Sequence, residues 1–120
     1  MLLFHDAKLI SCSMDQSIKI WDLKQQYYED DPATLYDHDD EVISADIRPM
    51  DSLLATMDIS GTILIRSIQT LQDAENVLYT INSLPKEIKE MAKVLFNKER
   101  AGDEAEILVL IGDQLMVLDI

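Results

Sequence analysis

The sequence has few basic residues, a single cysteine, three glycines and three prolines. Its 10 lysines and arginines face 23 aspartates and glutamates, which gives a formal net charge of −13. Nucleic acids and anionic membranes are bound through Lys and Arg, so this balance argues against both as direct ligands. Because Cys12 is the only cysteine, no internal disulfide can form, and a structural zinc site would lack its thiolates.

Long hydrophobic runs are also missing. No apolar stretch approaches the roughly 18 residues of a membrane-spanning helix. The four apolar residues 1–4 are followed at once by His5 and Asp6, so they are too short for a signal peptide. We therefore expect a cytoplasmic protein.

The chain still contains enough hydrophobic residues for a core. Hydrophobic residues make up 48% of its 120 residues, which is too many for a disordered acidic tail. A chain of this length suits one domain at most and would bury roughly two thirds of its unfolded surface.

Hydrophobic residues occur in short groups of strand length that are rich in β-branched side chains, and turn-forming residues separate them. This pattern predicts an all-β chain of antiparallel meanders. The groups are residues 9–10, 18–21, 42–47, 53–55, 63–65, 77–81, 107–111 and 115–118.

One segment shows both helix and strand signals. Ser83 resembles a helix cap, and Ile88, Met91 and Leu95 recur at helical spacing, whereas residues 92–96 end in strand formers. We predict a short helical turn that enters a strand near residues 92–96.

The sequence contains an internal repeat. Residues 9–23 align without gaps to residues 54–68, an offset of 45. A third copy, residues 106–120, lacks two turn residues and ends in Leu118-Asp119-Ile120, which matches Trp21-Asp22-Leu23.

The first copy resembles the WD repeat. It carries the dipeptide Trp21-Asp22 after a short strand, with Asp15 six residues before the tryptophan. The resemblance implies a partial β-propeller of between two and three four-stranded antiparallel blades. It also implies a polar network in which the turn Asp15, with Ser11 or Ser13, bonds toward a buried Trp21 indole.

The second and third copies depart from the family pattern. Asp37-His38 stands at the place of the family's Gly-His, so the resemblance places His38 in the network of the second blade. Ser60, however, replaces the turn aspartate, and we expect that this network cannot close in the usual way. Arg66 replaces the tryptophan; it either pairs with nearby acidic groups or reflects sequence drift, and we favour drift. The third copy keeps only Leu118-Asp119.

The repeat divides the chain into an incomplete first blade (1–36), a second blade (37–81) and a degenerate, incomplete third blade (82–120). Propellers close with about four to eight blades, so we expect a propeller fragment. The order of the copies, with a long connection after the first, is similar to the C-terminal WD repeats of BEACH-domain scaffolds.

Two other features suggest binding surfaces. Tyr27 and Tyr28, followed by Glu29, Asp30 and Asp31, form a candidate partner surface, although one tyrosine could instead cover a blade edge. Carboxylates are dense from residue 29 to residue 51, which favours a solvated loop over a surface for a basic partner, and either over a cation site. Cys12 is expected to be a small buried strand residue.

No phosphate-binding loop, nucleophile elbow or zinc spacing is present. We therefore expect no catalytic residue, cofactor or metal, and a non-enzymatic scaffold that binds other proteins. The alternative is a chain that folds only when it completes a propeller with another chain or self-associates through open blade edges.

Overall fold

The computed structural model describes residues 1–23, 32–82, 84, 91–99 and 105–119. Within them the chain forms three antiparallel sheets and one short helix, and no helix is long and apolar enough to cross a membrane. The prediction of an all-β chain is confirmed.

The first sheet has the order β1-β2-β3-β4. Asp6 and Ala7 connect β1 to β2, and both have positive φ angles (47° and 57°), as the tightest hairpin turns require. The strands are β1 (Leu2–His5), β2 (Lys8–Cys12), β3 (Ile18–Asp22) and β4 (Ala33–Leu35).

The second sheet has the order β5-β6-β7-β8. A helix that the sequence analysis did not predict, α1 (Leu71–Ala74), lies between β7 and β8, and Thr70 caps it by accepting a bond from the Asp73 N–H. The strands are β5 (Val42–Arg48), β6 (Leu53–Asp58), β7 (Ile63–Ser67) and β8 (Tyr79–Ile81).

The third sheet has the order β11-β10-β9, with β9 (Ala92–Phe96), β10 (Glu106–Ile111) and β11 (Gln114–Asp119). β9 confirms the predicted strand at 92–96. The helical turn predicted to begin at Ser83 lies mostly at residues 83 and 85–90, outside the described residues.

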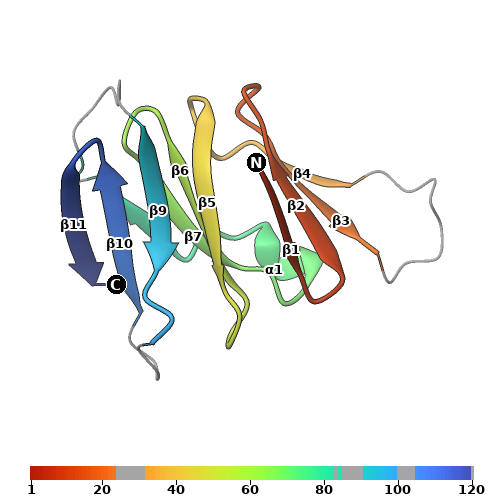
Figure 1. Cartoon of the computed structure of the whole chain (residues 1–120). Helices are drawn as coiled ribbons and strands as arrows, with labels where there is room; N and C mark the ends of the chain where they lie inside the picture. Colours follow the sequence, from red (N-terminus) through yellow and green to blue (C-terminus); the bar gives the residue numbers. More distant parts are fainter. Residues whose placement is uncertain (24–31, 83, 85–90, 100–104, 120) are drawn as a thin grey trace.

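The three sheets pack face to face, with the second sheet in the middle (Figure 1). β5 contacts β1 and β2 on one side and β9 on the other. One hydrophobic cluster lies between the first and second sheets, and it includes Ile10, Ile18, Ile20, Ile47 and Leu54. A second cluster lies between the second and third sheets, and it includes Met57, Ile63, Ile65, Val94 and Ile107.

The 45-residue repeat is visible in the strand pairing of the first two sheets. Cys12 pairs with Ile18 and Met57 pairs with Ile63. Each connecting turn has a residue of positive φ at the equivalent place, Gln16 (73°) and Gly61 (87°). The aligned residues therefore have the same local structure.

In the third sheet, Leu110 pairs with Leu115. When Leu118 is aligned with Trp21, Leu110 corresponds to Cys12 and Leu115 corresponds to Ile18. The third turn is thus one residue shorter than the first, and the sequence estimate of two missing residues was wrong.

Side chains of β5 complete the hydrogen bonding of β9. The Val94 N–H donates to Ser44 Oγ (3.0 Å), and the Phe96 N–H donates to Asp46 Oδ2 (2.8 Å). The same carboxylate lies 3.0 Å from Lys98 Nζ. Two backbone N–H groups that face the neighbouring sheet are satisfied in this way, as buried donors must be.

Replacing Asp46 with alanine should lower the free energy of unfolding by about 1–3 kcal/mol, because the buried Phe96 N–H loses its acceptor. Urea unfolding measures the change. Asp46→Asn keeps an acceptor oxygen and should cost less, and Lys98→Met, which removes only a half-exposed ion pair, should cost under about 1 kcal/mol. Equal losses in all three variants would contradict this account.

Candidate functional site: the buried His38 network

In the first sheet, the predicted network residues do not converge on an indole. Asp15 Oδ1 accepts hydrogen bonds from the Ser17 N–H (3.0 Å) and the Ser17 hydroxyl, and Ser13 Oγ lies 3.4 Å from the Asp15 N–H. The Ser17 hydroxyl bond is the largest cause that lowers the pKa of Asp15. Asp15 and Ser13 therefore close their own turn, and Ser11 lies half-buried on β2.

The prediction of a buried Trp21 was wrong for this chain. Trp21 is 39% exposed on the face of the first sheet that points away from the second sheet, where it pairs with Leu9. Asp22 pairs with Lys8 at the end of β3.

The second sheet contains the closed network that the first sheet lacks. His38 precedes β5 and is 2% exposed. Its Nδ1 lies 2.8 Å from Asp58 Oδ2, and its Nε2 lies 2.7 Å from Thr56 Oγ1. As predicted, the network does not close through the turn position of Ser60; it closes in another way, because Asp58, two residues earlier, takes the place of the missing aspartate.

The turn after β6 explains why Asp58 can do this. Asp58 Oδ1 accepts bonds from the Ser60 N–H (2.9 Å), the Ser60 hydroxyl (2.5 Å) and the Thr62 N–H (3.1 Å). Its other oxygen remains free for His38. One carboxylate therefore orders the turn and also fixes the ring.

The partners determine the protonation of His38. An ionised carboxylate only accepts hydrogen bonds, so Nδ1 of His38 carries the proton and donates it to Asp58. In the neutral ring Nε2 is then the acceptor, and Thr56 donates its one hydroxyl proton to it at 2.7 Å rather than to the Leu64 carbonyl at 3.5 Å. Burial is the main cause that lowers the pKa of His38 below its ordinary 6.5, and the hydrogen bond to Asp58 opposes this shift.

Arg66 occupies the position equivalent to Trp21 and is fully buried. Its Nη1 donates to the Ala74 carbonyl (2.8 Å) and lies 2.8 Å from Asp37 Oδ2. The ion pair is the alternative that the sequence analysis did not favour. Arg66 Nε and Nη2 have no hydrogen-bond partner among the described residues.

The arrangement Thr56–His38–Asp58 matches in order the triads that activate a hydroxyl nucleophile. Each of the three residues, however, is at most 2% exposed. A substrate cannot reach the Thr56 hydroxyl without opening the core between the first and second sheets. What this geometry does chemically is to tie the segment before β5 to β6.

The dense acidic segment is not one surface. Asp37 pairs with Arg66, Asp46 with Lys98, and Asp51 with Arg48. Within the parts of the chain that the structure describes, no group of three or more His, Cys, Asp or Glu residues could hold a metal ion. The candidate partner surface from Tyr27 and Tyr28 to Glu29, Asp30 and Asp31 lies outside the described residues.

Cys12 is buried on β2, as predicted, and has a free thiol. Burial raises the pKa of this thiol to about 11. At neutral pH almost none of it is thiolate, which is the reactive form. The packing of Cys12 in the first core therefore explains its presence.

Sequence reasoning missed Asp58, and it considered the ion pair of Arg66 without favouring it. The signal for Asp58 was an acidic residue at the start of the same turn, 45 residues after Ser13. The signal for the ion pair was an arginine in a buried repeat position with Asp37 next to the network histidine.

Comparison with known proteins gives no match to any family model and none to any curated protein.

The His38 network predicts a pH dependence of stability. Since the pKa of His38 is lower in the folded state, its contribution is complete above the unfolded value of about 6.5 and is lost as the pH falls toward the folded value. Between about pH 7.5 and about 5.5, the slope from this group is at most about 1.4 kcal/mol per pH unit.

Urea unfolding of wild type and His38→Gln over this range isolates the effect, because carboxylate titrations are shared by both. The difference in unfolding free energy should shrink as the pH falls. His5→Gln is the matched control and should keep the wild-type slope, because it retains His38. A difference that does not vary with pH would show that His38 is not held neutral.

Proposed function

We propose that this chain is part of a WD-repeat β-propeller and acts as a non-enzymatic cytoplasmic scaffold that binds other proteins. One observation carries the proposal. The second sheet combines the 45-residue repeat with a buried His38–Asp58–Thr56 network at the position where the WD repeat has its own. Within that family, the chain resembles the C-terminal repeats of BEACH-domain trafficking and signalling scaffolds, such as neutral-sphingomyelinase-activation-associated factor.

One end of the molecule offers loops for such binding. The β2–β3, β6–β7 and β10–β11 turns all lie at this end (Figure 1). The Ile59 N–H donates to the Glu41 carbonyl, so the segment before β5 reaches it as well. We call its exposed residues Met14, Tyr36, Asp39, Met91 and Asp113 the turn end.

The turn end combines exposed apolar side chains with carboxylates. Met14, Tyr36 and Met91 are each more than two thirds exposed. Asp39 and Asp113 are exposed as well, in a chain of net charge −13. Apolar anchors with an acidic surround fit a protein partner that presents a basic, partly apolar surface, and acidic charge speeds the encounter.

Quantitative affinity capture from cell extract tests the proposal. A partner retained by the wild-type chain should be lost in Met14→Ser/Tyr36→Ser and released by raised salt. Leu78→Ser/Tyr79→Ser removes two exposed apolar side chains elsewhere and should retain it. If the two double variants capture the same proteins as the wild type, the turn end is not the binding surface.

A second role is favoured by a different observation. Large apolar side chains are exposed on the outer faces of the first and third sheets, among them Phe4, Trp21, Leu110 and Leu115. Such faces are characteristic of interaction sites rather than of a free surface. The chain would then complete a propeller with another chain or associate with itself.

A further inference from the structure

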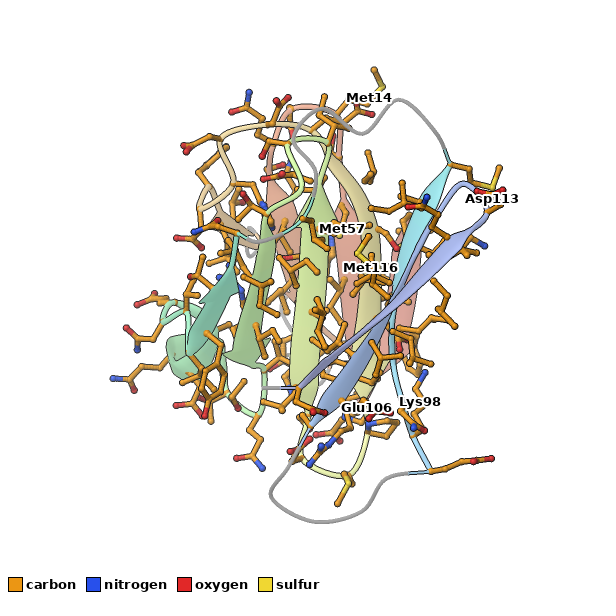
Figure 2. All side chains as sticks on the ribbon, turned by 90° about the vertical axis from the view of Figure 1, so that its left-hand side faces the viewer. Met14, Met57, Lys98, Glu106, Asp113 and Met116 are labelled. Atoms are coloured by element: carbon orange, nitrogen blue, oxygen red, sulfur yellow. The ribbon has the colours of Figure 1, made fainter. Side chains whose placement is uncertain are left out.

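Each sheet has two faces, which we name by the neighbour they point to. The N-side face points toward the preceding sheet, and the C-side face points toward the following one. Within the described chain, the N-side face of the first sheet and the C-side face of the third sheet have no sheet packed on them. Figure 2 views the molecule from the third sheet, whose strands lie in front of the others.

The uncovered C-side face is largely apolar. Strand pairing aligns Leu95, Leu108 and Val117 in one row, and Lys93, Leu110 and Leu115 in the next. Leu115 is 63% exposed and Val117 is 55% exposed. Five adjacent aliphatic side chains on one sheet face form a surface that a second sheet could bury.

The repeat indicates how this face can pack, because its counterparts in the other two sheets are buried. Its residues Leu108, Leu110, Leu115 and Val117 occupy the positions of Ile10, Cys12, Ile18 and Ile20 in the first sheet. In the second sheet the same positions hold Ala55, Met57, Ile63 and Ile65. All eight of these counterparts are buried against the following sheet, none more than 8% exposed.

The uncovered N-side face corresponds to the other half of the interface between consecutive sheets. Strand pairing places Phe4, Leu9 and Trp21 in one row across β1, β2 and β3, with Ser11 and Lys19 in the next. The repeat gives each residue of this face on β2 and β3 a counterpart 45 residues later in the second sheet. The counterparts of Leu9, Ser11, Lys19 and Trp21 are, in order, Leu54, Thr56, Leu64 and Arg66. Those four residues are buried on the side of the first sheet, none more than 5% exposed.

We propose that copies of this chain associate head to tail, with the N-side face of the first sheet of one copy packed on the C-side face of the third sheet of the next. A single chain carries both halves of the interface that it already forms twice internally. Burial of apolar surface is the dominant favourable contribution to association, and the eight aliphatic and aromatic side chains named above take part here. The inference rests on the repeat packing behind the proposed function and not on partner binding.

An interface between two different faces is heterologous, so it builds closed rings or open filaments rather than a two-fold dimer. The net charge of −13 opposes the approach of two copies. Salt screens this repulsion, and it should therefore strengthen self-association while it weakens binding of a basic partner.

Two variants block one face each. The N-side variant is Phe4→Glu/Trp21→Glu, and the C-side variant is Leu110→Glu/Leu115→Glu. The matched control, Met50→Glu/Leu78→Glu, places the same two charges on exposed apolar residues elsewhere.

Sedimentation velocity across a concentration series should show wild type and control as species larger than the monomer, and more so at raised salt. Each face variant should be monomeric by itself. An equimolar mixture of the two should form a 1:1 heterodimer, because one intact N-side face meets one intact C-side face. The heterodimer would also show that both variants are folded.

Three outcomes would overturn the proposal: a monomeric wild type at the highest concentration, a face variant that still self-associates, or a mixture that stays monomeric. A face variant that persists as a dimer would indicate a two-fold or strand-edge contact instead. Affinity capture with the C-side variant separates the two proposals, since loss of self-association leaves the turn end unchanged.

Discussion

The hydrogen bonds of His38 fix the segment that leads from the first sheet into the second. The ring joins three parts of the chain, the segment before β5, the middle of the second sheet at Thr56, and the turn that Asp58 orders. A buried imidazole without both partners would leave polar atoms unsatisfied in a hydrophobic core, at a cost of about 1–3 kcal/mol for each. This clamp fixes the path of the chain as it enters the second sheet.

The ion pair of Arg66 depends on the same segment. Asp37, next to His38, lies where its carboxylate meets the buried guanidinium, which also bonds to the last residue of α1. Where the first copy has an aromatic ring, the second therefore has a cation whose charge is balanced by the residue beside the histidine. A buried Arg66 with Asp37 held elsewhere would be an uncompensated charge.

The sheets stack because each C-side face that has a neighbouring sheet contributes aliphatic rows to a core. On the C-side face of the second sheet, Ser44 and Asp46 of β5 also accept hydrogen bonds from backbone N–H groups of β9. Exposed apolar side chains such as Phe4, Leu115 and Val117 lie on the two sheet faces that have no neighbouring sheet among the described residues. The same rows of apolar side chains thus form the cores between the sheets and remain exposed on the outer faces of the first and third sheets.

Much of the fold could be predicted from local pattern. The alternation of apolar residues and the turn residues gave the strands, and the 45-residue offset gave the matching hairpins of the first two sheets. The role of Asp58 could not be predicted, because an aspartate two residues away in the same turn reaches the histidine only through the three-dimensional path of that turn. The exposure of Trp21 and the burial of Arg66 depend on which sheet face has a neighbour, and a single sequence does not contain that information. The short helix α1 was missed because four residues are too few to show a helical period.

The central claim is that His38 is a neutral, immobilised clamp with its proton on Nδ1. The most direct measurement is ¹H–¹⁵N NMR of the His38 ring in uniformly labelled protein at neutral pH. The account predicts a slowly exchanging ring proton on Nδ1 and an Nε2 signal typical of an unprotonated nitrogen, with the proton signal lost in Asp58→Ala. A proton on Nε2, or a ring whose protons exchange rapidly with water, would contradict it.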